Sequence, residues 1–225
     1  MRIRLLQNSP DTPPGSLIPW LEAKKLPYQI DRLYDGAPVP SVDDVDWVIA
    51  LGGAMNCDQE AEFPYLREEK KLLADAVARK KAVLGLCLGG QLLARALGAS
   101  VRQGEGWEVG WHPVILSNAT RIVTFQWHQD TFDLPEGAQQ IVTGSFCANQ
   151  GFIHSSCAIG LQFHPEATEE WIVACASDAH YPSGPHVQAP EQIINDIGFL
   201  PPLQKWFFSF LDQMERVART AAARG

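Results

Sequence analysis

The amino-acid sequence predicts an α/β fold organised around a mostly parallel β-sheet. Short apolar runs with the length of buried strands alternate with segments in which apolar residues recur at helical spacing. This order of strand, helix and strand is typical of parallel sheets whose strands are joined by helical crossovers. The chain has 225 residues, of which 46% are hydrophobic and 20% are charged. That length and composition suffice for a sizeable core, and we expect one domain over residues 1–225.

The first half of the chain contains the clearest elements. Four apolar runs predict buried strands, at residues 3–6, 28–33, 47–51 and 82–86. Three helices are expected to join them, at residues 16–25, 64–80 and 90–97. A proline-rich turn at residues 10–14 precedes the first helix, and Gly98 is a suitable stop for the third. In the second helix, the apolar residues predict one buried face, with Glu and Lys on the other.

The second half shifts toward β-structure and ends in a helix. Strands are expected at residues 113–116, 121–125, 139–142 and 158–163. Residues 178–188, rich in His, Pro, Gly and Ser, predict a surface loop. Apolar residues then recur at helical spacing after Pro201 and Pro202, which predicts a closing helix at about residues 202–222 that packs on the sheet.

Composition and charge exclude several classes of protein. The chain carries 18 Lys and Arg against 26 Asp and Glu, a net charge of -8, and no basic block, so we expect no nucleic-acid partner. No segment approaches the roughly 18 apolar residues of a membrane span, and we expect a soluble, cytoplasmic protein. Five cysteines form no CxxC pair, which favours reduced thiols over disulfides or a metal site. Since no GxxxxGK[ST] phosphate loop is present, we expect neither ATP nor another cofactor.

The stretch GLCLGGQ, residues 85–91, places a thiol between a predicted strand and a predicted helix. Such a strand–turn–helix junction lifts its central side chain above the carboxyl edge of the sheet, where ligands of open α/β folds bind. The N-terminus of the helix favours thiolate over thiol at Cys87, and Gly85 and Gly89 allow close approach of the backbone. The alternative is a buried cysteine that acts as a small hydrophobic residue.

A second candidate group follows the last predicted strand, in the sequence FHPE. His164 and Glu166 lie two residues apart, so in an extended segment both side chains point the same way. Glu166 could then hold one ring nitrogen of His164 while the other faces the sulfur. A lone structural histidine is the alternative for this position.

Together these segments resemble the class I glutamine amidotransferase family. GLCLGGQ fits the family's GxCxGxQ nucleophile motif, and GLQFHPE fits the block that carries its His and Glu. Three further blocks agree: ALGGAMN at residues 50–56, EVGWHPV at 108–114 and QWHQDTFDLP at 126–135. The last is typical of the stand-alone branch that is similar to the glutaminase part of GMP synthase. The resemblance runs from about residue 46 to residue 171 and implies a flavodoxin-like, three-layer α/β/α fold.

The resemblance implies a role for each motif residue. Cys87 would attack the side-chain amide of glutamine to form a γ-glutamyl thioester, His164 would transfer protons, and Glu166 would orient His164. The oxyanion would lie between the backbone N–H of Leu88 and that of Gly53 or its neighbour. Four residues are implied to border the glutamine pocket, namely Gly52, Gln91, His128 and Asp130. For Gln91 an ordinary helix position, and for His128 a hydrogen-bonded structural role, remain alternatives.

The motifs do not encode the acceptor of the ammonia or the oligomeric state. Ammonia could pass to a separate synthase, or the chain could be a stand-alone hydrolase of γ-glutamyl peptides or amides with the same triad. A catalytically silent docking subunit is a third possibility. Trp107, Trp111 and Trp127 are aromatic candidates for a pocket larger than glutamine needs, with core packing as the alternative.

Overall fold

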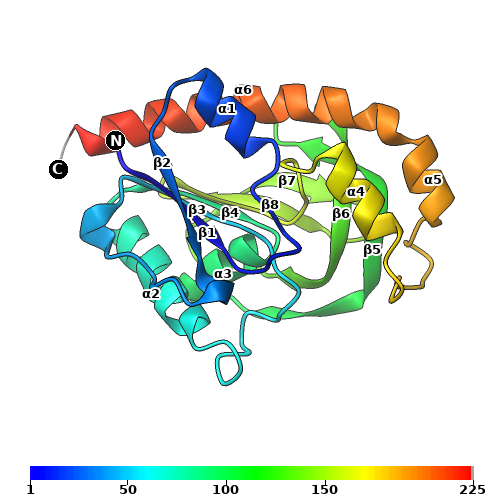
Figure 1. Ribbon diagram of the computed structural model, residues 1–225, viewed down its shortest axis with the longest axis horizontal. Helices are drawn as coiled ribbons and strands as arrows, with labels where there is room; N and C mark the ends of the chain where they lie inside the picture. The colour runs from blue at the N-terminus through cyan, green and yellow to red at the C-terminus, as the bar shows by residue number, and fades with distance from the viewer. Residues whose placement is uncertain (224–225) are drawn as a thin grey trace.

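The computed structural model describes residues 1–223 and contains one nine-stranded sheet, in the order β2-β1-β3-β4-β9-β8-β7-β5-β6 (Figure 1). The strands are β1 (Ile3–Gln7), β2 (Tyr28–Arg32), β3 (Trp47–Ala50), β4 (Ala82–Leu86), β5 (Val101–Leu116), β6 (Arg121–Phe132), β7 (Gln139–Gly144), β8 (Asn149–His154) and β9 (Ala158–Leu161). Neighbouring strands from β2 to β9 are parallel, and the remaining pairs are antiparallel. Only β5 and β8 therefore run against the common direction, which confirms the mostly parallel α/β fold.

Helices α1 (Leu17–Ala23) and α6 (Leu200–Ala222) lie on one face of the sheet, and α2 (Tyr65–Ala78) and α3 (Leu88–Ala96) lie on the other (Figure 1). Apolar residues of α1 and α6 share one buried cluster with alternate strand residues such as Leu5 and Ile49. The intervening strand residues, such as Leu6 and Val48, pack against α2 and α3. Successive side chains of a strand point to opposite faces of the sheet, so each central strand contributes residues to both helix layers. Parallel strands of this kind are buried on both faces.

The structure extends and adds to the predicted elements of the second half. β5 begins earlier than predicted, and β6 ends later. The added portions are polar and rich in glycine, and they pair with each other across a register shift between Gln103 and Glu108. β8 was not predicted, since its buried residues include Gln150 and Gly151, which interrupt an apolar pattern. Two short helices, α4 (Glu169–Ala176) and α5 (Pro190–Asn195), were also missed. Thr168 caps α4 by accepting a hydrogen bond from Trp171 N at 3.3 Å.

The predicted surface loop at residues 178–188 contains no helix or extended strand, apart from one bridge between Val187 and Val109. The sequence predicted that the glutamates of α2 all lie on its exposed face, and this prediction was wrong for Glu69. Glu69 lies on the buried face of that helix, between Leu66 and Leu73. Within residues 1–223, no helix combines the length and the apolar character needed to cross a membrane.

Candidate active site

Cys87 occupies a strained turn between β4 and α3. Its backbone angles are φ 50° and ψ -108°, a conformation that a non-glycine residue adopts at an energetic cost. Its N–H donates to Leu161 O at 2.8 Å, which fixes the turn against the end of β9. This is the geometry of a nucleophile elbow, which projects a side chain from the carboxyl edge of a parallel sheet.

Glycines beside the elbow allow the backbones to approach one another. A Cβ atom on Gly85 would collide with the carbonyl of Gly89, and one on Gly89 would collide with that of Ala50. A Cβ atom on Gly90 would lie 2.7 Å from Leu161 O. The small residues around the thiol are thus required by contacts between main-chain segments.

The imidazole of His164 lies beside this elbow and is held by Glu166. His164 Nδ1 lies 2.7 Å from Glu166 Oε1, and both side chains are about 2% exposed. The ring of Trp171 packs edge-on against the imidazole, with centroids 4.8 Å apart. A Cβ atom built on Gly52 would lie 2.9 Å from His164 Cε1 and 3.7 Å from Cys87 Cβ. The thiol-bearing residue and the imidazole therefore flank the same glycine.

Electrostatics favour a protonated His164. Burial opposes the charged imidazolium, but the negative charge of Glu166, that of the Cys87 thiolate and the hydrogen bond to Glu166 raise the pKa of His164 to about 10. A cationic imidazolium next to sulfur stabilises the thiolate, which is the reactive form of cysteine. The arrangement can therefore supply a nucleophile and a proton from neighbouring groups.

The loop after β3 faces the beginning of α3. A Cβ atom on Gly53 would lie 2.7 Å from Leu88 Cδ2 and 3.2 Å from Asn8 Cβ, so these groups are in direct proximity. Leu88 is the first residue of α3, where a backbone N–H has no acceptor within its own helix. Thr12 Oγ1 donates to Gly52 O at 2.8 Å and ties the loop to the segment after β1.

Gln91, His128 and Asp130 meet on the other side of the thiol. Gln91 Nε2 donates to Asp130 O at 3.2 Å, and His128 Nδ1 lies 3.0 Å from the same oxygen. The other ring nitrogen of His128 lies 3.0 Å from Glu108 Oε2. Both ring nitrogens of His128 therefore have protein partners, one on its own strand β6 and one on β5. The Asp130 carboxylate accepts a hydrogen bond from Asn56, and burial raises its pKa.

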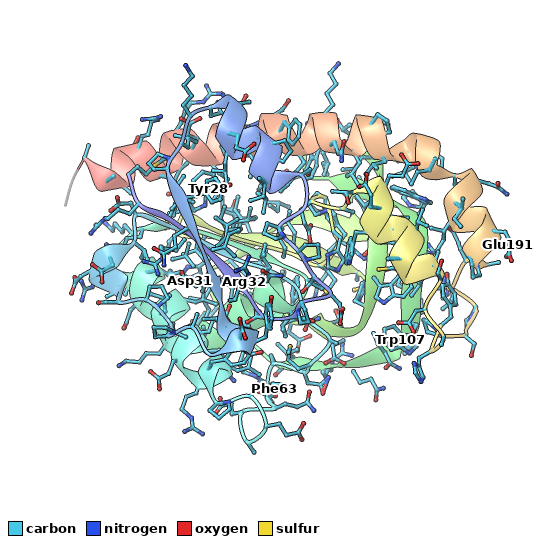
Figure 2. All side chains as sticks on the ribbon, in the orientation of Figure 1. Tyr28, Asp31, Arg32, Phe63, Trp107 and Glu191 are labelled. Atoms are coloured by element: carbon cyan, nitrogen blue, oxygen red, sulfur yellow. The ribbon has the colours of Figure 1, made fainter. Side chains whose placement is uncertain are left out.

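A cavity of about 410 Å³ joins these groups. Of the predicted site residues, those that line it are Gly53, Cys87, Gln91, His128, Asp130 and His164. Gly52, Leu88 and Glu166 are not among the lining residues; Gly52 and Leu88 are adjacent in the chain to Gly53 and Cys87, and Glu166 contacts His164. Trp107, labelled in Figure 2 on the side of the molecule that carries α4 and α5, and Trp127 also line the cavity. Trp111 instead is buried and packs against Phe125.

Glu108, His128 and Cys147 bring possible metal-binding atoms within 4.8 Å of one another. Glu108 Oε2 already accepts from Gln150 Nε2 at 2.7 Å in addition to its contact with His128. Cys147 Sγ lies 3.2 Å from Thr131 Oγ1. Hydrogen bonds account for these buried polar groups, and burial raises the pKa of the Cys147 thiol.

Several residues at the site carried no clear signal in the sequence. Gln162 Nε2 lies 3.8 Å from Cys87 Sγ, and Trp171 Nε1 donates to Asp11 O at 2.5 Å. Gln162 lies within the GLQFHPE block, where its position just before His164 is the signal available. Asp11 and Trp171 are far apart in the sequence and are brought together only by the fold.

The fold and the site define an α/β protein with a cysteine at a nucleophile elbow and a histidine–carboxylate pair beside it. Residues 22–171 match the family model described as "Glutamine amidotransferase class-I". The chain belongs to the class I glutamine amidotransferase family.

Relatives and solved structures agree with this assignment. The glutamine amidotransferase-like protein YfeJ of Salmonella typhimurium is 28% identical, over 76% of this chain and 78% of its own. A glutamine-hydrolyzing GMP synthase subunit of Thermoplasma acidophilum is 28% identical, over 65% of this chain and 72% of its own. The crystal structure of a glutamine amidotransferase from Methylobacillus flagellatus matches with a TM-score of 0.91 and 26% identity, covering 96% of this chain and 94% of the other. These similarities confirm the predicted family and its GMP synthase-like relatives.

Proposed function

We propose that the protein hydrolyses the side-chain amide of glutamine through a cysteinyl γ-glutamyl thioester. The observation that carries the proposal is the position of His164, which is held by Glu166 at 2.7 Å and lies against the elbow that presents Cys87. A nucleophile, a base and an orienting carboxylate on separate segments form the arrangement that acyl transfer needs.

The proposed reaction begins when the Cys87 thiolate attacks the amide carbon of glutamine. The carbonyl oxygen becomes an oxyanion that the N–H groups of Leu88 and Gly53 stabilise. The C–N bond then breaks, and the His164 imidazolium gives its proton to the departing ammonia. His164 next takes a proton from water, the resulting hydroxide attacks the thioester, and glutamate leaves as the thiolate is restored.

Ammonia release from glutamine by the purified chain tests this function. Cys87→Ala removes the nucleophile and is expected to abolish both turnover and covalent labelling by the glutamine analogue diazo-oxo-norleucine. Cys157→Ala, which removes a buried thiol on the far end of β9, serves as the matched control. Labelling that persists in Cys87→Ala contradicts the proposal.

A second candidate, a γ-glutamyl amide or peptide hydrolase with the same triad, is favoured by the volume and the aromatic lining of the cavity. Trp107, Trp127 and Trp171 line the cavity together with Cys87 and His164. The cavity of about 410 Å³ falls within the roughly 300–1,000 Å³ typical of ligand pockets, so it has room for a leaving group larger than ammonia. We expect a substituted amide to place its larger amine against one of these rings, and Trp171 is the one that also packs against His164.

The ratio of kcat/KM for γ-glutamyl benzylamide and for glutamine separates the two candidates. A ratio well above one that falls in Trp171→Ala supports the γ-glutamyl amide hydrolase. A ratio below one supports glutamine as the substrate, with the ammonia passing to a separate synthase. If Cys87 is labelled but neither amide is hydrolysed, a docking or partner-dependent subunit is favoured.

A further inference from the structure

A buried carboxyl group lies beneath the loop that carries the proposed oxyanion donor. Glu69 on α2 has no exposed surface, and its Oε1 accepts a hydrogen bond from Asn8 Nδ2 at 3.3 Å. The same nitrogen donates to Leu51 O at 3.1 Å. Because Leu51 directly precedes Gly52 and Gly53, one side-chain amide links Glu69 to the loop beside the thiol.

Two atoms of this pair have no partner among residues 1–223, namely Glu69 Oε2 and Asn8 Oδ1. An ionised carboxylate has only acceptors, and the amide oxygen of Asn8 is an acceptor as well, so neither can satisfy the other. One proton on Glu69 Oε2 supplies the missing donor. The carboxylic acid and the amide then form two reciprocal hydrogen bonds, from Asn8 Nδ2 to Glu69 Oε1 and from Glu69 Oε2 to Asn8 Oδ1. Both buried oxygens thereby gain a partner.

The surroundings of Glu69 favour this neutral form. The neighbouring cations of α2 and α3 are engaged elsewhere, because Lys70 pairs with Glu60 and Arg95 pairs with Asp58. The titratable group that faces Glu69 is Tyr65, whose hydroxyl donates to Asn8 O at 2.9 Å. Burial, and then the charge of Glu69, raise the pKa of Tyr65 to about 12. Burial raises the pKa of Glu69 itself to about 8, against the opposing effect of its hydrogen bond from Asn8.

We propose that Glu69 is a neutral carboxylic acid in the active protein and that its proton, shared with Asn8 Oδ1, holds residues 51–53 in position. Glu69 contacts no reacting atom and is therefore a positioning residue. Its ionisation places an unpaired charge in the core next to an amide oxygen, which loosens the link between Asn8 and Leu51. The effect on catalysis rests on the function proposed above, whereas the protonation of Glu69 does not.

The pH dependence of amide hydrolysis in four proteins tests this role. Glu69→Leu removes both hydrogen bonds and is expected to lower kcat about tenfold or more, with a smaller change in KM, because a displaced oxyanion donor weakens transition-state stabilisation. Glu69→Gln supplies a donor and an acceptor at every pH. It should recover most of the activity lost in Glu69→Leu and move the alkaline limb, expected near pH 8 in the wild type, upward by at least one pH unit. Glu68→Gln, an exposed neighbour on the same helix, should follow the wild type.

The carboxyl carbon of Glu69, observed by ¹³C NMR in the wild-type protein, gives an independent readout. It should report a protonated acid at pH 7 and titrate near pH 8. Titration near the ordinary glutamate range of about 4.3 overturns the proposal even if no variant folds. An alkaline limb that is identical in the wild type and Glu69→Gln overturns the positioning role. If no amide is hydrolysed by any protein, the proposed function fails, and the carbon signal alone decides the protonation state.

Discussion

Gly52→Ala measures how closely the proposed acid–base group is packed against the loop after β3. The added Cβ atom would lie 2.9 Å from His164 Cε1, whereas ordinary van der Waals contact begins near 3.4 Å. The imidazole must therefore retreat by about 0.5 Å, and its contacts with Glu166 and Trp171 restrict that movement. Since a displacement of about 1 Å can lower a catalytic rate about 100-fold, we expect kcat to fall roughly tenfold.

The assay is steady-state release of ammonia from glutamine or from the preferred γ-glutamyl amide, together with the rate of Cys87 labelling by the glutamine analogue. Thermal unfolding of each variant establishes that the fold is intact. Gly198→Ala is the matched control, because a Cβ atom at that position meets no atom within 4 Å. If Gly52→Ala folds and retains kcat within twofold of the control, the proposed closeness of His164 to this loop is refuted.

Three further measurements follow from the charges of the site. Glu166→Gln removes a negative charge that raises the pKa of His164, which weakens the imidazolium–thiolate pair. Alkylation of Cys87 by iodoacetamide at pH 7 should therefore slow about tenfold, and an unchanged rate contradicts this prediction. Three aspartates line the cavity, and its described lining includes no Lys or Arg. A γ-glutamyl amide with a terminal ammonium should therefore show a kcat/KM about tenfold above that of the same amide with a terminal carboxylate. Equal values of kcat/KM contradict this prediction. The pKa of Glu69 is raised from 4.5 to about 8 by folding, so its contribution to stability is complete below pH 4.5 and is lost as the pH rises through 8. The Tm of Glu69→Gln should therefore fall less between pH 7 and pH 9 than that of the wild type.

The central part of the site could be predicted because its residues follow apolar strands directly. Cys87 follows β4, and the segment with His164 follows β9; these strands are parallel neighbours, so their carboxyl ends meet at one edge. The structure brings both residues to one cavity. Their catalytic roles stay predictions until the variants are measured.

The supporting residues could not be predicted from the same pattern. Glu69 occupies a position in the apolar stripe of α2, between Leu66 and Leu73, but glutamate is commonly exposed, and its identity outweighed its spacing. Asn8 follows β1 and acquires its role only when that strand pairs with β3, where the amide of Asn8 reaches Leu51 O. Contacts of this kind depend on the three-dimensional path of loops, for which local sequence carries no periodic signal.

The loop that carries the proposed oxyanion donor is fixed by contacts within this chain. Leu51 N donates to Leu6 O at 3.0 Å, Asn8 Nδ2 donates to Leu51 O at 3.1 Å, and Thr12 Oγ1 donates to Gly52 O at 2.8 Å. All three partners come from β1 or the segment that follows it, and none requires another protein. Donors that are positioned before the substrate arrives need no reorganisation during the reaction, which is the condition under which they lower the barrier most. Leu51 and Gly52 are thus held by the same strand pairing that builds the sheet, and we expect Gly53, the next residue, to be positioned with them.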